Sequence, residues 1–95
     1  MIDLNEKYIS FIKETVYHYL QNCEIYLFGS RTKGTAKKYS DIDIAIDSEE
    51  LTFEKKSLLK FLFEDSTMPY EVDIVDLNKV TDKFKELITA DLVQI

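Results

Sequence analysis

Two short polar motifs, separated by ten residues, carry the residue types in this chain that could do chemistry together. Gly29-Ser30 follows an apolar run, and such a turn presents bare backbone N–H groups and a hydroxyl to phosphate oxygens. Asp41-Ile42-Asp43 lies on the next predicted strand, where alternate side chains share a face, so both carboxylates should point the same way. A phosphate cradle beside a metal-binding carboxylate pair predicts nucleotidyl transfer from a metal-bound nucleoside triphosphate.

The Asp-x-Asp pair alone has an ordinary explanation, because it could form the solvent-exposed face of an amphipathic strand. Residues two apart on a strand have Cα atoms about 6.6 Å apart, so the carboxyl groups could also converge on one ion, or on two ions about 3.5–4 Å apart. Asp73 favours the second explanation, because it lies within the apolar run Val72-Asp73-Ile74-Val75, where an unpaired charge is costly. A neighbouring strand could bring Asp73 beside Asp41 and Asp43, and such hard oxygen ligands suit Mg²⁺ or Mn²⁺.

The basic residues are concentrated near the first motif. The chain carries a net charge of −6, yet four of its twelve basic residues fall between positions 31 and 38, and no acid occurs between Ile25 and Ser40. A small anion site in an acidic protein suits a triphosphate better than a polynucleotide, so we expect no direct nucleic-acid binding. Arg31 and Lys33 could be ordinary loop charges, but their place in the turn favours a contribution to phosphate binding.

Hydrophobic patterning predicts the elements that position these residues. Asp3-x-x-Glu6 resembles a capping box, and an apolar stripe then predicts a helix up to about Gln21. The remaining predicted elements are a strand at 24–28, a short helical turn and loop at 30–36, a strand at 41–47, a helix at 53–63, a strand at 70–76 in which Asp76 faces away from Asp73, and a helix from Val80 to about Leu92. The order α-β-β-α-β-α predicts an α/β (α+β) fold, a small mixed β-sheet packed by helices.

Length and composition limit the class of protein. The chain has 95 residues, 45% of them hydrophobic, which predicts one domain over residues 1–95 with a single core. Cys23 is the only cysteine, so a reducing cytoplasm is the expected location. No stretch approaches membrane-spanning length, and we expect no membrane association.

The motifs together resemble those of a known family. Gly29-Ser30-Arg31-Thr32-Lys33-Gly34-Thr35-Ala36 followed by Tyr39-Ser40-Asp41-Ile42-Asp43-Ile44-Ala45-Ile46 is similar to the signature of the polymerase-beta-like nucleotidyltransferases. Within that superfamily the chain resembles the minimal nucleotidyltransferases (MNT) of HEPN/MNT toxin–antitoxin pairs, which consist of the catalytic core alone. Val72-Asp73-Ile74-Val75-Asp76 matches the strand that carries the third carboxylate of the family.

The resemblance implies a role for each motif residue. Asp41 and Asp43 would bind two Mg²⁺ ions, with Mn²⁺ as a possible substitute, and Asp73 would complete the first metal site and help to deprotonate the attacking hydroxyl. Gly29 and Ser30 would hold the β- and γ-phosphates of ATP. The family also implies a partner, an all-helical HEPN-type ribonuclease encoded nearby, which receives AMP on a tyrosine and is thereby silenced.

Two other functions remain open from the sequence. The chain could be a nucleotide-binding subunit that neutralises a helical partner by contact alone, but pure binding would not need Asp73. It could also be a small-molecule adenylyltransferase, although so short a chain has little room to build a substrate pocket by itself. Intact-mass measurement of both proteins after incubation with ATP and Mg²⁺ would separate these possibilities.

Overall fold

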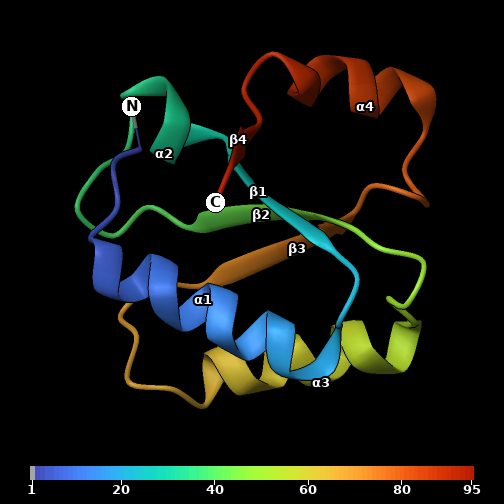
Figure 1. Ribbon diagram of the computed structural model, residues 1–95. Helices are drawn as coiled ribbons and strands as arrows, with labels where there is room; N and C mark the ends of the chain where they lie inside the picture. Colours follow the sequence, from blue (N-terminus) through green and yellow to red (C-terminus); the bar gives the residue numbers. More distant parts are fainter. Residues whose placement is uncertain (1) are drawn as a thin grey trace.

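The computed structural model describes residues 2–95 and shows a mixed sheet with helices on both faces (Figure 1). The elements are α1 Glu6–Tyr19, β1 Glu24–Phe28, α2 Ser30–Lys33, β2 Ile42–Asp47, α3 Phe53–Glu64, β3 Val72–Asp76, α4 Asp82–Thr89 and β4 Val93–Gln94. In the sheet the strand order is β3-β2-β1-β4. β1 runs antiparallel to β2 and β4, whereas β2 and β3 are parallel. The predicted fold class is therefore confirmed, and no helix in this part of the chain is long and apolar enough to cross a bilayer.

Helix α1 begins after a cap that differs from the predicted one. The side chain of Asn5 accepts a hydrogen bond from the N–H of the second helical residue at 3.0 Å. The predicted capping box of Asp3 and Glu6 is wrong, because the backbone of Asp3 is bonded elsewhere. Its N–H donates to the carbonyl of Arg31 at 2.8 Å, and its own carbonyl accepts from the Arg31 guanidinium at 3.0 Å. The segment before α1 is thus fastened to α2.

The alternation along β2 sorts its side chains onto two faces, as predicted. Ile42, Ile44 and Ile46 are fully buried on the face that α1 and α3 cover. Asp43 lies half-buried on the opposite face, where Ala45 is covered by α4. One strand therefore supplies the centre of the core and also carries a carboxylate to the other side of the sheet.

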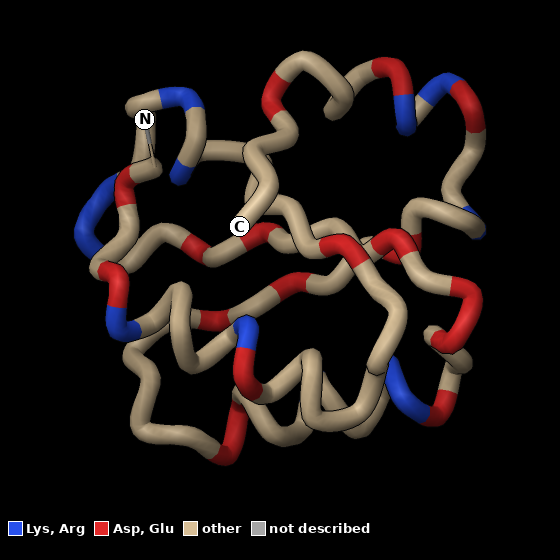
Figure 2. The backbone as a smooth tube through the Cα atoms, in the orientation of Figure 1, with Lys and Arg blue, Asp and Glu red and all other residues tan. Residues whose placement is uncertain are grey.

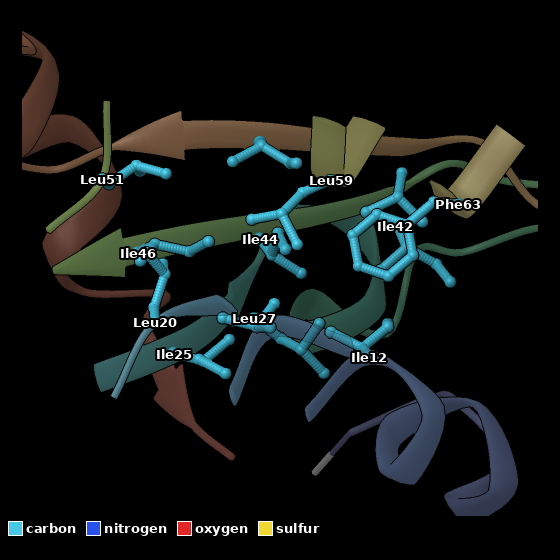
Figure 3. Packing of buried hydrophobic residues seen from close by; sticks show 13 residues of the cluster. Ile12, Leu20, Ile25, Leu27, Ile42, Ile44, Ile46, Leu51, Leu59 and Phe63 are labelled. Carbon is cyan, nitrogen blue, oxygen red and sulfur yellow. The ribbon is translucent and has the colours of Figure 1, made fainter. Parts of the chain in front are cut away.

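The main core lies between the sheet and the helix pair α1 and α3 (Figure 3). Ile12 and Val16 from α1 meet Leu59 and Phe63 from α3, and each of these side chains is at most 1% exposed. Full burial of a side chain of this size contributes about 1.5–3 kcal/mol. This layer fixes the sheet and, with it, the register on which the opposite face depends.

The C-terminal region departs from the prediction. Helix α4 begins at Asp82, because the side chain of Thr81 accepts a hydrogen bond from the third helical N–H at 3.2 Å. It ends at Thr89, so it is shorter at both ends than the predicted helix. Val93–Gln94 then forms β4, an unpredicted strand that pairs with β1. Two residues are too few to show a periodic pattern.

Candidate active site

Gly29 forms the turn between β1 and α2 and lies directly against the carboxylate of Asp43. Its φ of +79° falls in the left-handed region, which glycine adopts without steric cost. A Cβ atom at this position would stand 2.5 Å from Oδ2 of Asp43. Phe28 is the register partner of Asp43, so the pairing of β1 with β2 creates this contact. The structure therefore brings the two predicted motifs together.

Asp43 and Asp73 lie side by side on the parallel strands β2 and β3, as the sequence predicted. They are register partners, and adjacent strands are about 4.8 Å apart. Asp41 lies just before β2 and is exposed, as is Asp73. Burial, followed by the negative charges of Asp73 and Asp41, raises the pKa of the Asp43 carboxyl above its ordinary value. The three carboxylates thus form one electrostatic group where β2 and β3 begin.

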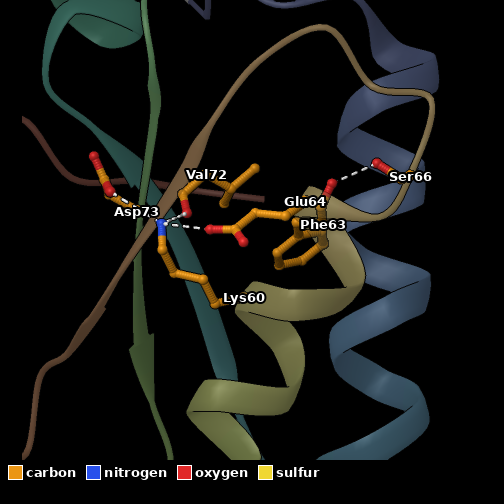
Figure 4. A network of polar contacts seen from close by, with 6 residues as sticks. All are labelled: Lys60, Phe63, Glu64, Ser66, Val72 and Asp73. Atoms are coloured by element: carbon orange, nitrogen blue, oxygen red, sulfur yellow. Dashed lines mark hydrogen bonds and ion pairs between the residues drawn. The ribbon is translucent and has the colours of Figure 1, made fainter.

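Lys60 on α3 contacts Asp73 at the outer edge of the sheet (Figure 4). Its Nζ lies 3.4 Å from Oδ1 of Asp73, 3.1 Å from the carbonyl oxygen of Val72 and 3.7 Å from Oε1 of Glu64. Among residues 2–95, no three Asp, Glu, His or Cys side chains are close enough together to hold a metal ion. The carboxylates therefore repel one another without converging, while Asp73 is paired with Lys60. Sequence reasoning missed this lysine, because its spacing from Glu64 is common on exposed helices.

Arg31, one of the two predicted phosphate contacts, is buried. Its guanidinium donates to the backbone carbonyls of Asp3 at 3.0 Å and Ser40 at 2.8 Å. It also lies over the ring of Tyr70, 4.5 Å from the ring centroid. These contacts tie α2 to the segment before α1, to the loop before β2 and to the segment before β3. They give Arg31 a structural role that local sequence did not indicate, because all its partners are distant in the chain.

Lys33, the other predicted phosphate contact, is exposed and close to the turn. Its Nζ lies 3.2 Å from Oδ2 of the half-buried Asp91, and an ion pair near the surface contributes about 0–1 kcal/mol. A phosphate could replace that partner at little cost. Figure 2 shows basic segments around α2 and the loop that follows it, and acidic positions along the central strands. Ser30, the first residue of α2, is half-buried next to Gly29.

Two other acids of these strands lie away from the group. Asp47 pairs in register with Glu24 at the far end of β2. Asp76 is buried, on the opposite face from Asp73, and its Oδ1 accepts from the N–H of Asn78 at 2.9 Å. The placement of Asp76 confirms the prediction that it faces away from Asp73.

The chemistry of the group fits a divalent cation bound together with a triphosphate. Carboxylate oxygens are hard ligands of the kind that Mg²⁺ prefers. Burial and the neighbouring carboxylates raise the pKa of Asp43, and a cation would relieve the repulsion between these carboxylates. Next to this carboxylate, Gly29 leaves backbone uncovered, and any side chain there would press on Asp43. The arrangement can therefore bind a negatively charged phosphate at the Gly29 turn and a divalent cation at the carboxylates.

Comparison with known proteins agrees with this chemistry. The family model for the polymerase beta nucleotidyltransferase domain matches residues 4–95. The probable protein adenylyltransferase MntA of Haemophilus influenzae is 38% identical over 95 residues, which span 99% of this chain and 83% of that protein. The protein adenylyltransferase MntA of Thermococcus cleftensis is 32% identical over 76 residues, which span 76% of this chain and 73% of that protein.

A solved structure extends the likeness to three dimensions. It is a crystal structure of a toxin–antitoxin with AMP-PNP, and one of its chains is 29% identical with a TM-score of 0.78. The match covers 96% of the present chain and 72% of that chain. The family model matches nearly the whole chain, the relatives are named protein adenylyltransferases, and the fold is shared. This chain therefore belongs to the minimal nucleotidyltransferase family of the polymerase-beta-like superfamily.

Proposed function

We propose that this protein transfers AMP from ATP to a hydroxyl, that of a tyrosine, on a HEPN-type partner, and that it acts as the antitoxin of that partner in the cytoplasm. One observation carries the proposal: the Asp43 carboxylate lies against the bare backbone of Gly29 and in register with Asp73. The relatives named protein adenylyltransferases and the complex with an ATP analogue support the same activity.

The carboxylates would hold the cation and prepare the acceptor. Asp41 and Asp43 would bind two Mg²⁺ ions, or Mn²⁺ in their place, with Asp73 completing the first site. The ions would supply charge neutralisation at the attacking and leaving oxygens. Asp73, on the strand beside Asp43, would help to take the proton from the acceptor hydroxyl as it attacks the α-phosphorus and pyrophosphate leaves.

The turn would bind the leaving phosphates. Gly29 and Ser30 would present backbone N–H groups and the serine hydroxyl to the β- and γ-phosphates. Lys33, whose own side chain is exposed, would add a positive charge by exchanging its partner Asp91 for a phosphate. Arg31 would contribute indirectly, since its guanidinium fixes the loop that leads from α2 to Asp41.

The partner would supply the acceptor hydroxyl. Large apolar side chains are exposed on the two helices that flank β3, at Phe53 and Phe61 on α3 and at Leu87 on α4. Phe53 and Phe61 line one shallow groove along α3, and apolar groups that gather in this way are typical of protein interfaces. They also suit the alternative function, a subunit that binds nucleotide and neutralises its partner without catalysis, so exposure alone does not separate the two.

Intact-mass analysis of the partner tests the proposal. The purified protein is incubated with the HEPN-type protein encoded beside it, with ATP and Mg²⁺, and both proteins are weighed. We expect the partner to gain the mass of one or more AMP groups, and to gain none when Asp43 is replaced by Asn or when Mg²⁺ is chelated. A complex that forms while neither mass changes would support the binding subunit instead.

A further inference from the structure

Lys60 belongs to a helix on the other side of the sheet from the carboxylate group, yet its ammonium reaches one member of that group. Helix α3 packs its buried side chains, Leu59 and Phe63, on the face opposite to Asp43. β3 is the edge strand, so Lys60 can pass around it and bind Asp73 and the carbonyl of Val72 together (Figure 4).

Asp73 lies between a positively charged and a negatively charged side chain. The ammonium of Lys60 lies 3.4 Å from Oδ1 of Asp73 and attracts it. Asp43, the register partner of Asp73, carries the same charge and repels it. Pairing with Lys60 compensates the negative charge of Asp73. Within residues 2–95 no three acidic, His or Cys side chains lie close enough together to hold a metal ion, and Oδ1 of Asp73 contacts Lys60 instead. A cation that recruits Asp73 must therefore take it from Lys60.

We propose that Lys60 is a positioning residue: it retains Asp73 at the sheet edge in the metal-free protein and releases it when a divalent cation binds with a nucleoside triphosphate. The inference rests on the proposed function, because it needs Asp73 as a metal ligand. Lys60 lowers the affinity for the cation by competing for one of its ligands. Tight binding of the cation then depends on the nucleotide, because its phosphate oxygens supply metal ligands in addition to the carboxylates.

A purely structural role for Lys60 makes a different prediction. Lysine beside an edge strand can simply satisfy a free carbonyl and discourage strand pairing. In that role its charge would not matter to the cation, and only the hydrogen bond to Val72 would count. Lys60→Gln keeps a donor for this carbonyl but removes the charge, so it separates the two roles.

The test measures Mn²⁺ binding by electron paramagnetic resonance, with and without a non-hydrolysable ATP analogue, and so does not depend on activity. Pairs as exposed as Lys60 and Asp73 are weak, so we expect Lys60→Met and Lys60→Gln to bind Mn²⁺ about two- to fivefold more tightly than the wild type. Lys56→Met is the matched control, because Lys56 lies one turn earlier on α3 and makes no ion pair within residues 2–95. In an Asp73→Asn background most of the gain should disappear.

Each outcome decides between the roles. Unchanged or weaker Mn²⁺ binding in both Lys60 variants, with normal thermal melts, would overturn the inference while leaving the proposed function intact. The same gain in Lys56→Met, or a full gain in the Asp73→Asn background, would show a general charge effect and would also overturn it. If the wild type binds no Mn²⁺ even with the analogue, the proposed metal-dependent function fails first and the role of Lys60 fails with it.

Discussion

The two faces of the sheet are built from alternate residues of the same strands, but they do different things. On the α1 and α3 face the strand side chains that form the core, among them Ile42, Ile44 and Val72, are apolar and buried (Figure 3). On the α4 face the corresponding positions carry Asp43 and Asp73, and in residues 2–95 the buried cluster there is small, consisting of Ala45, Leu77 and Ile88. One face supplies the stability that lets the other hold like charges close together, which a thin apolar layer could not do alone.

The first prediction concerns the stability of the core on the α1 and α3 face. Leu59→Ala removes a fully buried side chain between α3 and the sheet and should lower the free energy of unfolding by about 2–5 kcal/mol. Leu58→Ala is the control, because Leu58 lies next to Leu59 on the same helix but is 37% exposed, so its substitution should cost clearly less. Urea unfolding followed by circular dichroism measures both. Equal losses in the two variants would mean that this face is not the main source of stability.

The second prediction compares two glycines of the polar face. Gly29→Ala and Gly34→Ala both place a Cβ at positive φ, at +79° and +75°, so each should lose about 1–2 kcal/mol of stability. Only at Gly29 would the new Cβ also meet Asp43, whereas at Gly34 nothing lies within 4 Å. We therefore expect Gly29→Ala alone to lose affinity for ATP with Mg²⁺, measured by calorimetry. Similar affinity in the two variants would remove Gly29 from the site.

The third prediction concerns the charge that the polar face carries. The pKa of Asp43 is raised in the folded protein, so the folded state binds this proton more readily than the unfolded chain. The stability of the wild type relative to Asp43→Asn should therefore increase as pH falls through the raised pKa, and the increase is complete below the unfolded value of about 3.9. Urea unfolding of both proteins over this range, with a chelator present, measures the difference. A wild type that loses stability relative to the variant on acidification would contradict the pKa direction.

Local patterns predicted the elements that place the site. Alternation along residues 41–47 identified which side chains of β2 face the core, and the apolar run around Asp73 predicted a third strand. The placement of Asp73 beside Asp43 was predicted from the cost of an unpaired charge in an apolar strand, together with the possibility that a neighbouring strand brings the two carboxylates together. These features depend on periodicity and on the cost of burying a charge, both of which are visible in a few consecutive residues.

Contacts between distant segments could not be predicted in the same way. Arg31 was expected near phosphate because of its neighbours in sequence. Its partners are instead two backbone carbonyls, those of Asp3 before α1 and Ser40 before β2. Lys60 was missed because nothing local marks a lysine that reaches around an edge strand. The short strand β4 depends on pairing with β1 rather than on its own two residues. In each case tertiary geometry decided the outcome.

The central claim is that the carboxylate face binds a divalent cation together with a triphosphate, and a thermal melt of Asp43→Asn tests it most directly. Ligand binding stabilises a protein by about 2.7 kcal/mol at a hundredfold excess over Kd, which for a domain of this size raises Tm by several degrees. We predict that the wild type shows this rise with Mn²⁺ and ATP, whereas Asp43→Asn melts at the same or a higher temperature without ligand and gains almost nothing. An equal gain in both proteins, or an unfolded variant, would contradict the account.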